Sequence, residues 1–307
     1  MFAILAAVLL TSCEKPIIDE AVGGEPDANV IIRVSSLEQM PFTRSVCGDA
    51  IATKTRAAQP VTALCTRLNF AIYQNGEKVK TVAQKQGDAS FGSVALNLSE
   101  GTYQLVIIAH SSNGTATMTS EEKVTFPDNR VTDTFYYYGP LTVTAETETH
   151  DLALTRAVAM FRLVLTDDDL SDVAQMKFYY TGGSSTFSPA TGYGSVNSRQ
   201  TVTLDVPATP NGSDYSGADG IPSTATVLEV YTFPHAETGE LKMTVTALAA
   251  NGQTLAERTF ENVPVIRNQI TQYTGSFFGS GGSGQQSEGT FRLTADPDWS
   301  SVNGYTF

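Results

Sequence analysis

Cysteine and histidine are the residue types best suited to covalent and acid–base chemistry, and this chain has three of each. Cys13 has the most informative surroundings, because it follows the apolar run Phe2–Leu10 and the small residues Thr11 and Ser12. At about 1.5 Å rise per residue, a helix over that run would be about 14 Å long, roughly half the hydrocarbon thickness of a bilayer. The run is therefore too short to span a membrane, but it has the length of the apolar region of a signal peptide.

Leu10-Thr11-Ser12-Cys13 resembles a bacterial lipobox. In a lipobox the cysteine thiol receives diacylglycerol, cleavage frees the cysteine amine, and that amine is then acylated. The resemblance implies a signal peptide over residues 1–12 and lipidation of Cys13. Residues 13–29 mix charged residues, Pro and Gly without a regular period, which predicts a flexible tether. The alternative is a buried N-terminal strand in which the cysteine is incidental.

Cys47 and Cys65 are the two remaining thiols. An exported chain meets an oxidising compartment, in which these two residues can form a disulfide. Sequence spacing does not fix the geometry that a disulfide needs. Two unpaired, small apolar side chains are therefore the equally weighted alternative.

The sequence indicates no catalytic centre. Hydrolytic triads need a base beside a nucleophile, but each histidine lies in or beside an expected strand without a partner motif: His110, His150 and His235. The sequence also lacks HExxH, paired CxxC, GxxxxGK[ST] and GxSxG motifs. We expect no enzymatic activity and no cofactor.

Two acidic clusters are the only candidates for a metal site. Oxygen-rich loops can hold Ca²⁺, but neither cluster has the ligand spacing of an EF-hand loop. Carboxylates that accept hydrogen bonds from nearby backbone N–H groups explain them more simply, and we expect no metal. The clusters are Asp167, Asp168, Asp169 and Asp172 in one loop, and Asp296 and Asp298 near the C-terminus.

The charge balance excludes two classes of partner. With 19 basic and 32 acidic residues, the chain has a formal net charge of -13. Such a chain repels nucleic acid and anionic membrane surfaces unless it carries a local basic patch. Lys and Arg are scattered singly, so we expect no nucleic-acid binding and infer that membrane attachment depends on a lipid.

Beyond residue 30, β-branched and aromatic runs separated by turn residues predict an all-β chain. Asn75-Gly76 and Asn251-Gly252 are strong hairpin signals, because Asn and Gly tolerate the positive φ of a two-residue turn. Ser99–Gly101 predicts another hairpin. Phe135–Tyr138 should form a strand whose alternate rings face opposite sides, with one pair buried.

The strands divide into two sets near residues 151–156. Each set has about seven strands, the size of a small β-sandwich. We therefore expect an N-terminal domain over residues 30–153 and a C-terminal domain over residues 154–307. A Gly- and Ser-rich linker, residues 279–286, precedes a terminal segment in which Phe291 and Leu293 alternate with polar residues, followed by Trp299. We expect this strand to pair with its own domain, so that the isolated protein is a monomer.

Two motifs carry a resemblance to a known family. One is "LTRAVAMFRL", with Arg156, Ala157 and Ala159; the other is "VPVIRNQITQYTGSFF", with Arg267 and Asn268. Together with the lipobox and the all-β body, these motifs resemble the fimbrillin-like proteins of Bacteroidales type V pili, in particular the fimbrial anchor and minor subunits. Two positions differ from many relatives: Met160, where Lys is frequent, and Gln269, where His is frequent.

The resemblance implies two tandem transthyretin-like β-sandwich domains in a lipoprotein displayed at the outer membrane. It implies other fimbrial subunits as partners and assembly by β-strand exchange, in which main-chain hydrogen bonds supply affinity and alternating side chains fill pockets. In such pili, stalk subunits are cut after a basic residue beyond the first strand, whereas anchor subunits keep their lipid. Arg44 and Arg56 are the candidates for a cut here, with Lys54 between them, and the alternative is an ordinary exposed loop. The alternative is a surface lipoprotein that binds a glycan or a host protein.

Overall fold

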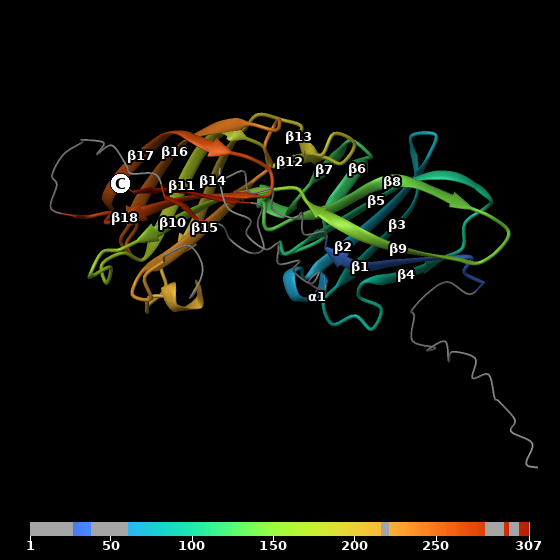
Figure 1. Ribbon diagram of the computed structural model, residues 1–307, viewed down its shortest axis with the longest axis horizontal. Helices are drawn as coiled ribbons and strands as arrows, with labels where there is room; N and C mark the ends of the chain where they lie inside the picture. The colour runs from blue at the N-terminus through green and yellow to red at the C-terminus, as the bar shows by residue number, and fades with distance from the viewer. Residues whose placement is uncertain (1–26, 38–60, 216–220, 280–291, 295–300, 307) are drawn as a thin grey trace, which may run out of the picture.

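Nearly all regular structure is β-strand in the computed structural model, which describes residues 27–37, 61–215, 221–279, 292–294 and 301–306 (Figure 1). The helical elements in these residues are single turns: α1 (Val61–Leu64), η1 (Pro127–Asn129) and η2 (Gly212–Tyr215). No described helix is long and apolar enough to cross a membrane. The all-β prediction is confirmed.

The first part of the chain forms a seven-stranded sheet with the order β3-β2-β5-β8-β9-β1-β4. β9 pairs with β8 near its C-terminal end and with β1 over residues 148–154, so the sheet curls around its own apolar face. This face forms core 1, whose largest fully buried side chains are Ile32, Leu68, Phe70, Ile72 and Phe135. The strands are β1 (Val30–Leu37), β2 (Arg67–Gln74), β3 (Glu77–Lys85), β4 (Ser93–Leu96), β5 (Gly101–His110), β8 (Phe135–Val143) and β9 (Glu148–Arg156).

The second part of the chain forms two sheets, with the orders β15-β10-β18-β20-β19 and β14-β11-β16-β17. Their facing sides form core 2, which includes Phe161, Phe178, Tyr180, Met243 and Phe260. The strands are β10 (Ala159–Leu165), β11 (Gln175–Gly183), β14 (Ser198–Asp205), β15 (Thr226–Thr232), β16 (Gly239–Leu248), β17 (Thr254–Val265), β18 (Gln269–Gly275), β19 (Arg292–Thr294) and β20 (Ser301–Thr306).

A small fourth sheet joins the two parts, which lie side by side along the long axis of the molecule (Figure 1). Its order is β13-β12-β7-β6, from β6 (Thr117–Ser120), β7 (Lys123–Thr125), β12 (Thr186–Ser188) and β13 (Tyr193–Gly194). The pairing of β7 with β12 therefore connects the two sides of the expected domain boundary.

Beneath this small sheet lies a third apolar cluster, the junction core. Phe233 stacks on both Phe126 and Phe187, with ring centroids 5.5 and 4.9 Å apart, and Tyr136 contacts Phe187 edge-on at 4.8 Å. The cluster takes residues from β2 and β5 on one side and from β10 and β18 on the other. The division at residues 153 and 154 stays a prediction, but the two parts share a packed boundary.

The hairpin signals have different outcomes. Asn75 and Gly76 both have positive φ, 53° and 81°, and they connect the antiparallel strands β2 and β3 as predicted. The loop at Asn251 and Gly252 joins the antiparallel strands β16 and β17. The hairpin predicted at Ser99–Gly101 is wrong: β4 pairs with β1, while the following strand β5 pairs with β2 and β8.

The aromatic run Phe135–Tyr138 begins β8, as predicted. Phe135 and Tyr137 contact core 1, whereas Tyr136 and Tyr138 contact the junction core, so alternate rings do face opposite sides. The expectation that one pair is buried needs correction, because only Phe135 is fully buried and both faces of the strand are packed. The second face packs into the junction core, where Tyr136 contacts Phe187 of the other half of the chain.

Candidate functional site: the terminal strands and the junction

The C-terminal strands extend a sheet whose inner strands are parallel. β10, β18 and β20 run in the same direction, with Ile270 opposite Val302 and Tyr273 opposite Tyr305. β19 then pairs antiparallel with β20, and Leu293 lies opposite Asn303. The strand beside β18 is therefore β20, and β19 with Leu293 is one position further out. Phe291 and Trp299 lie outside the described residues, so the proposed exchange role of this segment stays a prediction.

The N-terminal strand β1 occupies an inner position of the seven-stranded sheet. It pairs antiparallel with β4 and parallel with β9, from Val30 opposite Glu148 to Leu37 opposite Leu154. Val30, Ile32 and Val34 are buried in core 1. β1 thus supplies both backbone partners and apolar side chains to the first half of the chain.

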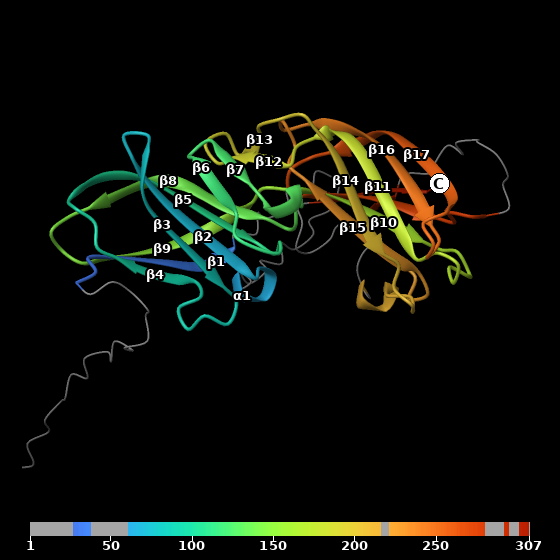
Figure 2. The same cartoon turned by 180° about the vertical axis from the view of Figure 1, so that it is seen from behind.

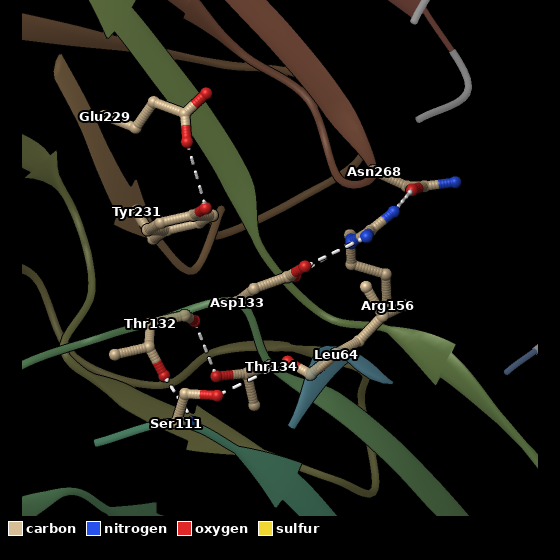
Figure 3. A network of polar contacts seen from close by, with 9 residues as sticks. All are labelled: Leu64, Ser111, Thr132, Asp133, Thr134, Arg156, Glu229, Tyr231 and Asn268. Carbon is tan, nitrogen blue, oxygen red and sulfur yellow. Dashed lines mark hydrogen bonds and ion pairs between the residues drawn. The ribbon is translucent and has the colours of Figure 1, made fainter. Parts of the chain in front are cut away.

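A buried ion pair lies where the two halves meet, and Figure 3 shows its partners. Arg156, at the end of β9, donates to Asp133 from Nε at 2.8 Å and from Nη2 at 2.9 Å. It also donates from Nη1 to Oδ1 of Asn268 at 3.1 Å, and its guanidinium carbon lies 4.6 Å from the centroid of the Phe135 ring. The bidentate geometry fixes the direction of the guanidinium group as well as its position.

Asn268 has a local reason for its place in this network. Its φ is 60°, a left-handed conformation that Asn adopts more easily than most residues. Its backbone N–H donates to the carbonyl of Val158 at 2.8 Å. The turn between β17 and β18 therefore holds the amide side chain toward Arg156, 112 residues away in the sequence.

Arg267 makes a second connection across the junction. Its Nη1 donates to the hydroxyl oxygen of Tyr136 at 3.3 Å and to the carbonyl of Gly192 at 3.1 Å, and its guanidinium carbon lies 4.9 Å from the Tyr193 ring centroid. Gly192 has φ of 74°, and a Cβ there would collide with the Tyr136 hydroxyl. Only glycine therefore permits this close approach.

The sequence of residues 33–303 matches the model of a family of unknown function, DUF6562. The chain belongs to this family. No curated protein sequence matches it significantly.

Solved structures similar to this DUF6562 chain have low sequence identity. A candidate adhesin from Bacteroides ovatus is 15% identical with a TM-score of 0.44, and the match covers 83% of this chain and 88% of that one. The fimbrial anchor protein Mfa2 from Porphyromonas gingivalis is 9% identical with a TM-score of 0.36, covering 75% and 80%. Because these TM-scores are below 0.5, we base the proposed function on the chain's own residues.

A second buried ion pair lies on the outer face of the β15-β10-β18 strands of the DUF6562 chain. Arg162 donates from Nε to Glu229 at 2.8 Å and from Nη1 to Oε1 of Gln272 at 3.4 Å. Tyr231 donates to Glu229 at 3.5 Å, and burial followed by the Glu229 charge raises the pKa of Tyr231 well above its usual value. The charged groups of Arg162 and Glu229 are therefore held inside the fold by hydrogen bonds to each other, to Gln272 and to Tyr231.

A serine, a histidine and an asparagine form a hydrogen-bonded chain that sequence analysis missed. Oγ of Ser112 lies 2.6 Å from Nδ1 of His110, and Nε2 of His110 lies 2.9 Å from Oδ1 of Asn69. The backbone N–H groups of Ser112 and Ala116 donate to Nδ1 and to Oδ1 respectively, which fits a neutral histidine protonated at Nε2. The residues are 3%, 0% and 1% exposed.

The environment of this chain suits a structural role. Burial lowers the pKa of His110 to about 4, with a further contribution from the charge of Arg67. A general base works best with a pKa near the operating pH, and a substrate would have to reach a fully buried ring. We assign Ser112, His110 and Asn69 to the interior packing of the first half.

The other predicted site residues are placed as follows. Cys65 is a buried free thiol whose pKa is raised by burial. Its pairing with Cys47 stays a prediction, because Cys47 lies outside the described residues, as do Cys13, Arg44 and Arg56. Three carboxylate contacts confirm the capping interpretation for Asp167, which accepts from the Ser276 hydroxyl and from the N–H groups of Phe277 and Phe278.

The remaining acidic residues add no metal ligands in the described residues. Asp169 accepts a hydrogen bond from the N–H of Ser171, which lowers its pKa. Across the described part of the chain, no three His, Cys, Asp or Glu side chains gather as a metal ion would require. Asp296 and Asp298 lie outside the described residues.

Proposed function

We propose that this chain is a lipid-anchored structural subunit of a cell-surface fimbria, assembled by β-strand exchange. The observation that carries the proposal is the place of β1. It is bonded on both sides, by β4 and β9, and it fills core 1 with Val30, Ile32 and Val34. Arg44 and Arg56 follow it in the sequence, so a cut after either residue would release β1 together with the lipidated Cys13. An anchored copy therefore keeps β1, and the slot left by its removal belongs to a copy that has been cut.

Removal of β1 would leave a slot suited to a new strand. The parallel edge of β9 and the antiparallel edge of β4 would lose their partner, and core 1 would lose three buried side chains. A strand from another subunit with apolar residues at alternate positions would restore both the hydrogen bonds and the packing. This is the physical basis for strand exchange at the N-terminal half of the chain.

The candidate donor is the C-terminal segment in which Phe291 and Leu293 alternate with polar residues, followed by Trp299. β20 lies beyond two segments outside the described residues, and it pairs with β18 through backbone hydrogen bonds that another acceptor would satisfy equally. The linker at residues 279–286 is rich in Gly and Ser, which gives it reach. The short tether also keeps the strand at a roughly millimolar local concentration near its own domain, so the isolated chain keeps it.

The glycan-binding alternative receives less support from the described surface. A surface hollow of about 280 Å³ is lined by seven residues from the 169–173 loop and its neighbours, including Leu255 and Phe278. Phe278 is its single aromatic residue, whereas a sugar site favours several aromatic faces around a concave surface. We therefore keep the fimbrial role as the proposal.

Lipid anchoring is tested first, by cell fractionation. The Cys13→Ala protein should be absent from the outer membrane, because loss of the acyl chains removes about 0.8 kcal/mol of membrane binding per buried CH₂. Cys47→Ala is the matched control and should fractionate like the wild type. If the Cys13→Ala protein stays with the outer membrane, the proposal of lipid anchoring through Cys13 is wrong.

Strand exchange is tested separately, by co-purification with the fimbrial shaft. Deletion of residues 287–307 should expose the edge of β18, cause association of the isolated chain and change its incorporation into fimbriae. A truncated chain that stays monomeric, stable and fully incorporated would exclude a donor role for this segment. If the full-length chain never co-purifies with a fimbrial shaft, the fimbrial assignment itself fails.

A further inference from the structure

β14 is an edge strand without the usual protection against pairing. It ends the β14-β11-β16-β17 sheet, and within the described residues no other strand pairs with its outer side. Its register with β11 is regular from Gln200 to Asp205, and it contains neither Pro nor Lys. Natural proteins usually interrupt or charge such edges to prevent association.

The other edge strands of the described sheets are protected or short. β6, β13 and β19 have at most four residues, and in β15 the Asn211 side chain hydrogen-bonds the backbone N–H and C=O of Val227. β3 has three lysines and a register shift in its pairing with β2. β17 contains Pro264 and has two register shifts in its pairing with β16. β4 is only four residues long. The contrast makes the eight-residue β14 the edge best suited to β-augmentation; Figure 2 shows it beside β11.

The charges of β14 are complementary to those of a second, antiparallel copy. Arg199 and Asp205 are both exposed, lie on the same face and are equally distant from Val202. An antiparallel pair centred on Val202 places Arg199 of each copy opposite Asp205 of the other, and Thr201 opposite Thr203. Protective charges of one sign would repel a second copy, whereas these form two cross-strand ion pairs.

The inner face of β14 also favours this pairing. Val202 and Leu204 are half-buried at the rim of core 2. A second copy would place Val202 opposite Val202 and Leu204 opposite Gln200, which covers both apolar side chains and extends the sheet. Gln200 lies on the same face, and its Oε1 accepts a hydrogen bond from Thr232 at 2.9 Å.

We propose that two copies of this chain associate through an antiparallel β14–β14 contact with its two-fold axis at Val202. One strand pair is smaller than a standard protein interface, so the dimer is weak. The dilute chain remains a monomer, as the sequence predicts, and the dimer forms at high concentration or where copies are confined together. The contact is isologous and closes after two copies.

The test uses sedimentation velocity from micromolar to millimolar protein, on the full chain carrying Cys13→Ala so that no lipid drives association. The unaltered β14 should give a concentration-dependent dimer. Arg199→Asp places two carboxylates opposite each other, and Asp205→Arg does the same with two guanidinium groups. Each change should raise the dimer dissociation constant about tenfold. Lys85→Asp, the same charge change on the β3 edge, is the matched control and should have no effect.

Mixing provides the decisive measurement. An equimolar mixture of the Arg199→Asp and Asp205→Arg chains has complementary charges at both cross-strand positions, and it should form a heterodimer as tight as the original dimer. Strictly monomeric behaviour of the starting chain would overturn the proposal. So would single variants that dimerise like the starting chain, or a mixture no tighter than its components. Deletion of residues 287–307 leaves β14 intact, so the β14–β14 contact and strand exchange by the C-terminal segment can be tested independently.

Discussion

Core 1 is enclosed by strands of one curled sheet, whereas the junction core is enclosed by elements from both halves and adjoins buried charges. Arg156 with Asp133, and Arg267 with Tyr136, lie at the edge of the junction core, and the Arg156 guanidinium also lies over Phe135 of core 1. Apolar packing tolerates some change in relative orientation, but a bidentate ion pair does not. We therefore expect core 1 to supply stability and the junction charges to fix how the halves meet.

The largest effect should come from the junction, when one partner of its ion pair is removed. Asp133→Ala leaves the Arg156 guanidinium, whose side chain is 6% exposed, without its carboxylate. Breaking a buried pair in this way costs about 3–5 kcal/mol. Chemical denaturation measures the free energy of unfolding. Glu261→Ala removes half of the exposed pair with Lys242 and serves as the control, with an expected loss of at most about 1 kcal/mol.

Core 1 should respond to the loss of apolar volume. Ile32→Ala truncates a side chain that is 0% exposed in β1, at an expected cost of about 2–5 kcal/mol. Arg33→Ala, at the next and exposed position of the same strand, should change the stability by less than about 0.5 kcal/mol. Equal effects of the two substitutions would mean that β1 does not belong to core 1, and the slot argued for strand exchange would be lost.

The sequence predicts features governed by neighbouring residues. The Asn75-Gly76 hairpin and the strand at Phe135–Tyr138 depend on local turn chemistry and on alternation, and both are confirmed. The hairpin at Ser99–Gly101 is wrong because a turn signal does not tell which strands pair. β4 and β5 are consecutive in sequence but lie apart in the sheet order.

The sequence indicates some residues of the candidate site but not the contacts between them. Arg156 and Asn268 stand out in the two sequence motifs, but their contact depends on the packing of β18 beside β10. Asp133 and Glu229 carry no local signal, since their arginine partners are 23 and 67 residues away. The polar chain of Ser112, His110 and Asn69 was missed for the same reason, because β2 and β5 bring it together.

A pH titration tests the junction core independently of core 1, because His110 lies beside Phe126 of the junction core. The groups facing it are Asn69, Ser112, the Phe126 ring and the charge of Arg67. Its pKa falls from 6.5 to about 4 on folding, so the unfolded chain binds the proton at a higher pH than the folded chain. The stabilisation is complete above about pH 6.5 and is lost as the pH falls toward 4.

The expected loss from this histidine is about 3 kcal/mol over that interval. The measurement compares the free energy of unfolding of the wild type with that of His110→Gln, whose side chain does not titrate. The difference in their pH profiles isolates His110 from the carboxylates that titrate in the same range. His235→Gln, an exposed histidine, is the matched control. Parallel profiles for wild type and His110→Gln would contradict the assignment of a buried neutral ring.

The smallest effect should come from Arg267, and it tests whether the junction charges set orientation. Arg267→Ala removes hydrogen bonds to the Tyr136 hydroxyl and to the Gly192 carbonyl, and a contact with the Tyr193 ring. Since the side chain is half-buried, we expect a loss of only about 1 kcal/mol in global stability. The local stability of the 192–194 turn, which contains β13, should fall further, because the Arg267 side chain holds this turn against β8.

Hydrogen exchange of the backbone amides resolves this local effect. In Arg267→Ala, exchange should accelerate in β12, which pairs with β7 across the junction, and in β13, which pairs with β12, while the amides of β1 and β4 around core 1 keep their rates. Arg199→Ala, an exposed arginine in the same half, should change neither set. A uniform acceleration across all strands would mean that Arg267 contributes only to overall stability. Acceleration confined to the small sheet would show that one partly exposed arginine maintains the connection between the two halves.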